Sequence, residues 1–194
     1  MFFLILLIIL LDNFQKRWQC YDMNCFSRLF KNDSKNSKSS NKESDGYRFF
    51  SPVRGLAKSI TDSKDPAYSQ KLVGDGIMIL PADNKVYAPV DGKIEFIFPY
   101  RHAFGIRTCT NLDLFLHIRI GTEKLKENGF QMFVTEGQEV KQGQLIAEFD
   151  LVKLKKHAIS PALSVLITNL PNTQRLLSYT DKNVTLEDII FEIR

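Results

Sequence analysis

The sequence contains few of the residues on which metal and thiol chemistry depends. Its 194 residues include three cysteines, Cys20, Cys25 and Cys109. These cysteines form no CxxC pair and do not have the spacing of a zinc-ligand set. Their arrangement favours free thiols in a reducing compartment and argues against a disulfide scaffold. The sequence also lacks an HxH motif, an HExxH motif and a Walker-type glycine loop, which leaves the common motif-borne chemistries without support.

Long apolar runs are also missing. The run Met1 to Leu11 is apolar but reaches only about half of the ~20 residues that a membrane-spanning helix needs. Its basic residues, Lys16 and Arg17, come after the apolar stretch, whereas a secretory signal has them before it. Residues 1–22 are therefore predicted to be an N-terminal extension. It either lies upstream of a true start at Met23 or tethers a cytoplasmic domain to the membrane.

The charge pattern gives no indication of nucleic-acid binding. Lys and Arg number 26 against 22 Asp and Glu, and they are spread along the chain without a dense basic run. Residues 23–46 are predicted to be a disordered polar linker, because 32–46 contain no apolar residue that burial could stabilise. Residues 47–194 are long enough for one well-packed domain.

Beyond Tyr47, the pattern of apolar and turn-forming residues is that of an all-β protein. Short apolar runs are broken at close intervals by Gly, Pro and Asn-Asp signals. Residues 93–98, 112–118 and 144–150 are rich in branched and aromatic side chains and predict strands, while 151–160 and 185–190 predict short surface turns, the first of them helical. We therefore expect an antiparallel β-sandwich or barrel with short surface helical turns.

The strand LDLFLHI, residues 112–118, places two candidate functional residues on one face. Alternation puts its Leu and Ile side chains toward the core and Asp113, Phe115 and His117 on the other face. We expect Phe115 and His117 to share an outward, exposed surface. An apolar ring beside a titratable one at a surface suggests a docking site.

A second histidine is predicted to lie near His117. His102 begins the run HAFGIRT, and the residues around Cys109–Asn111 read as a hairpin turn into LDLFLHI. His102 and His117 are roughly equidistant from that turn, so an antiparallel hairpin brings them opposite each other. Two adjacent imidazoles suit metal ligation, acid-base chemistry or a nucleophilic histidine with a helper. The pattern also fits two ordinary surface histidines. The third histidine, His157, is predicted to lie separately on a short helical turn, where it is solvated.

Beyond the pattern, the chain resembles a known family over roughly residues 50–193. It is similar to the glucose-specific enzyme IIA phosphocarriers of the bacterial sugar phosphotransferase system. Four motifs, in the family's order and spacing, carry the resemblance: Lys71 to Ile94, the HAF of His102 to Phe104, the LFLHI of Leu114 to Ile118, and Glu136 to Leu151.

This resemblance implies a function. His117 would be phosphorylated on its imidazole, and His102 would stabilise the transferred group. The donor would be the small phosphocarrier protein HPr, and the acceptor a cysteine on the IIB domain of a glucose-type permease, which gives peripheral contact with the membrane. Phe98 and Phe115 are predicted to form the rim of an apolar depression that the partner covers. No cofactor is implied beyond the transient phosphohistidine.

The sequence departs from the family pattern near His117. Family members usually read HFGIDT where this chain reads HIRIGT, so Arg119 replaces a glycine and Gly121 an aspartate that would meet an arginine on HPr. Asp65, which aligns with the family's other acidic contact, remains. Tyr100 stands where a threonine is common and is a candidate for orienting His102.

Three other interpretations stay open. A lipoyl- or biotinyl-type carrier shares similar turns, but no lysine stands in the required hairpin. A zinc hydrolase would need a third ligand, which the sequence lacks in register. Zinc on His102 and His117 is expected only where a partner completes the site, and not in the isolated domain. An interaction module that binds regulatory targets according to its phosphorylation state is the main alternative function.

Overall fold

The computed structural model describes residues 47–118, 129–150, 152 and 162–194, which all lie in one compact unit. The predictions made for residues 1–46, for Arg119 and Gly121, and for 151–160 apart from Val152 lie outside the described residues. Within the described ranges, no helix is long and apolar enough to cross a membrane.

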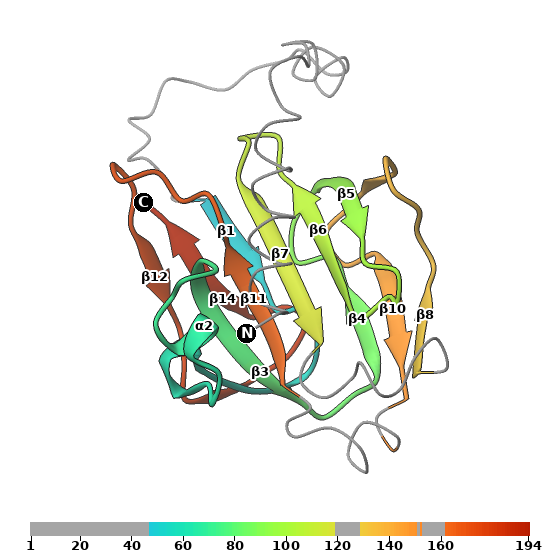
Figure 1. Cartoon of the computed structure of the whole chain (residues 1–194), viewed down its shortest axis with the longest axis horizontal. Coiled ribbons are helices and arrows are strands. Elements are labelled where there is room, and N and C mark those ends of the chain that lie inside the picture. Colours follow the sequence, from blue (N-terminus) through green and yellow to red (C-terminus); the bar gives the residue numbers. More distant parts are fainter. Residues whose placement is uncertain (1–46, 119–128, 151, 153–161) are drawn as a thin grey trace, which may run out of the picture. The chain divides into compact units, whose positions relative to one another are not determined.

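Antiparallel strands dominate the described chain (Figure 1). The strands are β1 (Tyr47–Phe50), β2 (Gly55–Ser59), β3 (Asp75–Pro81), β4 (Lys85–Tyr87), β5 (Gly92–Ile97), β6 (Ala103–Arg107), β7 (Asp113–Ile118), β8 (Phe130–Met132), β9 (Glu139–Val140), β10 (Leu145–Phe149), β11 (Leu163–Ile167), β12 (Leu176–Ser178), β13 (Lys182–Val184) and β14 (Ile189–Ile193). Two short helical elements, the 3-10 turn η1 (Ile60–Asp62) and the helix α2 (Pro66–Ser69), lie between β2 and β3. The expected antiparallel β architecture with short helical turns is confirmed.

The strands form three sheets. The largest has eight strands in the order β13-β2-β3-β11-β7-β6-β5-β9. Two three-stranded sheets, β1-β14-β12 and β4-β10-β8, complete the described part. Aliphatic and aromatic side chains from all three sheets meet in one buried cluster, which includes Phe49, Leu116, Phe149 and Phe191. Burial of this cluster is the main force that holds the sheets together.

The predicted strands agree well with these elements. Residues 93–98 correspond to β5, 112–118 to β7 and 144–150 to β10. Near the carboxyl end, Thr185 donates from both its backbone N–H and its hydroxyl to the Asp188 carboxylate, which closes a turn before β14. The short turn predicted within 185–190 is therefore present.

The hairpin β6–β7 is the element that carries both candidate histidines. Its turn is closed by the Thr108 N–H donating to the Leu112 carbonyl at 3.0 Å, and Asn111 adopts a φ of 60° there. Asn is among the residues that tolerate this left-handed backbone conformation. β7 also pairs with β11, so the hairpin lies inside the large sheet and not at its edge.

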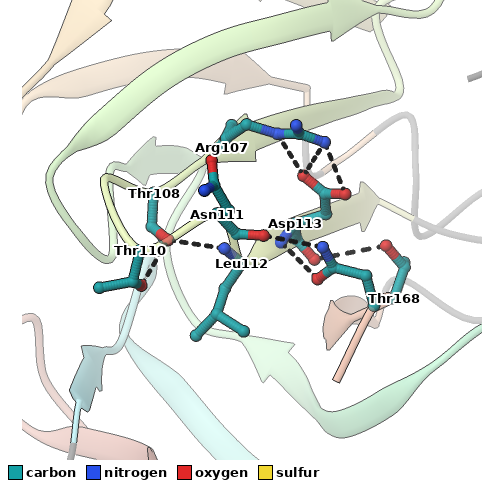
Figure 2. A network of polar contacts seen from close by, with 8 residues as sticks. Arg107, Thr108, Thr110, Asn111, Leu112, Asp113 and Thr168 are labelled. Carbon is teal, nitrogen blue, oxygen red and sulfur yellow. Dashed lines mark hydrogen bonds and ion pairs between the residues drawn. The ribbon is translucent and has the colours of Figure 1, made fainter. Parts of the chain in front are cut away.

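A polar network fixes the turn end of this hairpin (Figure 2). The Arg107 guanidinium donates to both carboxylate oxygens of Asp113, at 2.7 and 2.8 Å. The Thr108 hydroxyl accepts from the Leu112 N–H at 3.0 Å. Asn169, which follows β11, also belongs to this network. Its side chain accepts from the Asp113 N–H at 2.7 Å and donates to the Asn111 carbonyl at 2.8 Å. These bonds set the register of β6, β7 and β11 together.

Candidate functional site

At the open end of the same hairpin, the two imidazoles lie side by side. Strand register places Ala103 opposite His117, and the Ile118 N–H donates to the His102 carbonyl at 2.8 Å. The His102 and His117 ring centroids are 5.2 Å apart. The predicted juxtaposition is therefore confirmed, with the two histidines offset by one position from direct opposition.

Aromatic rings surround this pair. Phe98 packs edge-on against His102, with ring centroids 5.5 Å apart, and Phe115 lies 5.7 Å from His117. Phe96 and Phe98 contact each other and both contact Phe115. The imidazoles thus lie in an apolar surround that lowers the local dielectric and strengthens any charge interaction made there.

Glycine in the middle strand allows this aromatic cluster to form. Phe96 of β5, Gly105 of β6 and Phe115 of β7 lie in one row across three neighbouring strands. A Cβ at Gly105 would overlap the Phe96 ring. Because Gly105 has no side chain, Phe96 lies over its backbone and approaches Phe115 to a centroid distance of 6.1 Å.

The expectation that Phe115 and His117 are outward and exposed is wrong. His117 is 7% exposed, His102 5% and Phe115 3%. Alternation correctly separated this face of β7 from the main core, since the Leu and Ile side chains of 112–118 all belong to the core cluster and these two residues do not. The second face is also covered, by Phe96 and Phe98 on its β5 side. Periodicity within one strand carries no information about that cover.

Tyr68 is a site residue that sequence reasoning missed. Its hydroxyl is 2.5 Å from Nδ1 of His117, and the residue is 3% exposed. The two residues are 49 positions apart and come from different elements, α2 and β7. The run DPAYS does indicate a capped turn with buried positions, but nothing in it identifies which strand the phenol meets.

Two further predicted residues lie near this site in defined environments. Asp65 caps α2, where its carboxylate accepts from the Ala67 N–H at 2.9 Å. Tyr100 is 45% exposed, and its ring centroid is 6.4 Å from that of His102. Leu72, just beyond α2, is 65% exposed. The buried imidazole of His102 therefore has an exposed aromatic residue, Tyr100, beside it.

Ser164 is a buried polar neighbour of His117. It lies directly opposite His117 on β11 and is 1% exposed.

Within the described ranges, no group of three or more His, Cys, Asp or Glu side chains has a metal-binding arrangement. Cys109 is exposed at the turn end of the hairpin, away from the two histidines in sequence, and lies near the Tyr47 hydroxyl.

This fold and histidine pair define the class of the glucose-type IIA domains. The structure is similar to that of glucose permease IIA from Mycoplasma capricolum, with a TM-score of 0.71 and 32% sequence identity over 78% of this chain and 96% of that one. The model of the phosphoenolpyruvate-dependent sugar phosphotransferase system EIIA 1 family matches residues 47–173. The chain therefore belongs to this family of EIIA phosphotransferase components.

Curated relatives are longer proteins. The chain is 42% identical over 121 residues to the glucosamine-specific EIICBA component of Bacillus subtilis, covering 62% of this chain and 19% of that protein. It is 38% identical over 145 residues to the glucose-specific EIICBA component of Staphylococcus saprophyticus, covering 74% and 21%. The chain thus spans about a fifth of the length of these relatives. The family match decides against the swinging-arm carrier.

Proposed function

We propose that His117 accepts a phosphoryl group from phospho-HPr and passes it to the IIB cysteine of a glucose-type sugar permease. The observation that carries this proposal is the pair of buried imidazoles, 5.2 Å apart between ring centroids, at one end of a rigidly held hairpin. Of the two, His117 lies on β7, the strand that pairs with both β6 and β11, whereas His102 precedes β6. A histidine whose strand is paired on both sides suits the acceptor, because transfer depends on positioning.

The transfer is a balanced exchange of one bond for another. The bond between phosphorus and HPr breaks as a P–N bond to His117 forms, and this second bond breaks as a P–S bond to the acceptor cysteine forms. No oxidant, reductant or additional cofactor is needed. Such a reaction depends chiefly on positioning and on stabilisation of the phosphoryl oxygens. His102 would donate a hydrogen bond to one of those oxygens.

Burial of His117 would also protect the phosphorylated intermediate. A phosphohistidine among Phe98, Phe115 and Phe96 is shielded from water that would otherwise hydrolyse it. Phe98 is half-buried and lies at the border of this site, whereas the buried Phe115 lies beneath it. We therefore infer that Phe98 and exposed Tyr100 contact the docked partner, and that Phe115 supports them from below.

Charge would add to this apolar docking surface. Asp65, which the resemblance implicates in contact with HPr, lies at the start of α2, the helix that bears Tyr68. A zinc ion on His102 and His117 would need a carboxylate from a partner, since the described residues supply no third ligand near them. The work of such a domain is at the cytoplasmic face of the membrane, where the permease presents its IIB domain.

Label transfer tests the proposal. Phosphoenolpyruvate, enzyme I and HPr are incubated with the full chain, with His117→Gln and with His102→Gln, and the acid stability of the label is recorded. We expect acid-labile label on the wild type and on His102→Gln, with none on His117→Gln. His102→Gln should then pass its label on to a IIB domain more slowly.

Two outcomes would count against the proposal. Label retained by His117→Gln would place the acceptor elsewhere. A wild-type chain that takes no label from phospho-HPr would favour the alternative, an interaction module without onward transfer.

A further inference from the structure

The phenol of Tyr68 contacts one of the two ring nitrogens of His117, Nδ1. Its hydroxyl lies 2.5 Å from Nδ1, and the two ring centroids are 5.9 Å apart. Both residues are buried, so bulk water competes poorly for this contact. In a neutral imidazole, one nitrogen carries the proton and the other carries a free lone pair. A hydrogen bond at one nitrogen determines which of the two is protonated.

Local structure holds this phenol in place before any partner arrives. Asp65 caps α2, and Pro66 occupies the first turn, where its fixed φ favours the helix and its missing N–H costs nothing. The Tyr68 carbonyl accepts from the Lys71 N–H at 2.9 Å, which closes the end of the turn. The segment 65–71 therefore presents a buried phenol to β7 from a rigid support.

We propose that Tyr68 is a positioning residue, whose hydroxyl accepts the Nδ1–H of His117 and so leaves the Nε2 lone pair for the incoming phosphoryl group. This inference rests on the proposed function of His117. The opposite arrangement, in which the phenol donates to Nδ1, puts the proton on Nε2 and blocks attack from that nitrogen. With Nδ1–H held by Tyr68, the P–N bond forms at Nε2 without a prior proton shift.

The same hydroxyl also suits the phosphorylated state. A hydroxyl can accept one hydrogen bond and donate another by rotating. If the ring loses its Nδ1 proton after transfer, Tyr68 can rotate and donate to the bare nitrogen. Tyr68 therefore keeps a hydrogen bond to the ring in both protonation states, and the ring stays oriented between receipt and release of the phosphoryl group.

Nitrogen NMR of the imidazoles tests this directly. The full unphosphorylated chain is compared with Tyr68→Phe, which keeps the ring and removes the hydroxyl, and His117→Gln identifies the His117 signals. We expect the Nδ1–H tautomer in the wild type and a shift of about tenfold in the tautomer ratio toward Nε2–H in Tyr68→Phe. Tyr179→Phe, a partly exposed phenol between β12 and β13, serves as control and should leave His117 unchanged.

Kinetics supply the second measurement. Tyr68→Phe should be phosphorylated about three- to tenfold more slowly at saturating phospho-HPr, with an unchanged KM. An Nε2–H tautomer in the wild type, or the same tautomer ratio and rate in both proteins, would overturn the role of Tyr68. A wild type that accepts no phosphoryl group would instead overturn the proposed function, while the NMR comparison would still decide whether Tyr68 sets the tautomer.

Discussion

The two ends of the β6–β7 hairpin carry different kinds of side chains, polar at the turn end and aromatic at the open end. At the turn end, the Arg107–Asp113 ion pair and the amide of Asn169 lock the strands through hydrogen bonds (Figure 2). At the open end, His102 and His117 lie among phenyl rings. The turn end fixes the register, and the open end uses that register to bring two imidazoles together. Stability and chemistry thus lie at separate ends of one element.

Loss of Arg107 should break the turn end with the largest effect on stability. In Arg107→Leu, Asp113 keeps a part-buried carboxylate without its cation, and we expect a loss of about 2–4 kcal/mol in the free energy of unfolding at neutral pH. Urea unfolding measures this loss. Arg54→Leu, at an exposed position, should change stability by less than about 0.5 kcal/mol. Phosphorylation of His117 should survive in both variants under conditions where they are folded.

The Arg107 effect should depend on pH. Burial raises the pKa of Asp113, and the Arg107 guanidinium opposes that rise. Without Arg107 the pKa of Asp113 in the folded state rises further above its unfolded value, so the folded state binds more protons than the unfolded state. The stability of Arg107→Leu must then fall as the pH increases through the range in which Asp113 loses its proton. The deficit of Arg107→Leu should be smaller at pH values near the Asp113 pKa than at neutral pH, and an equal deficit at both would contradict this account.

Gly105 connects the two ends, and a side chain there should damage both. Gly105→Ala pushes a methyl group into the Phe96 ring, and we expect a cost of about 1–3 kcal/mol together with slower phosphorylation. Phe96→Leu should relieve the overlap. A double-mutant cycle in thermal unfolding checks this, because the cost of Gly105→Ala should shrink in the Phe96→Leu background. Equal costs in both backgrounds would show that the Phe96 ring is not the obstacle.

Asp65 allows the smallest and sharpest test of the open end. Asp65→Ala removes the α2 cap and should cost about 1 kcal/mol, whereas Asp65→Asn preserves capping without the charge and should be nearly neutral in stability. If the carboxylate also contacts HPr, Asp65→Asn should raise the KM for phospho-HPr in spite of its normal stability. An unchanged KM in Asp65→Asn would restrict Asp65 to its role as a cap.

Local patterns were enough to predict much of this site. Alternation in 112–118 identified the core side chains of β7, and the equal spacing of His102 and His117 from the turn predicted their contact, because hairpin geometry depends only on the sequence between them. Burial of Phe115 and His117 could not be predicted in this way. It depends on Phe96, whose approach across β6 requires the bare backbone of Gly105.

Tyr68 illustrates the same limit more strongly. Its helix could be anticipated from Asp65 and Pro66, yet its contact with His117 joins elements that are distant in sequence and depends on how the connection from β2 to β3 packs beside β7. Likewise, the acidic character of Asp65 suggested a partner contact, while its part in capping the helix is evident from the bond to the Ala67 N–H. Long-range packing decides these roles.

The central claim is that His117 is the phosphoryl acceptor, and peptide mapping of the labelled full chain under alkaline conditions tests it most directly. Alkaline handling preserves a phosphohistidine that acid would destroy, so the label can be followed to a single residue. This account predicts the phosphoryl group on His117 alone, in the wild type and in His102→Gln alike. Label on His102, or on the neighbouring Ser164, would contradict it.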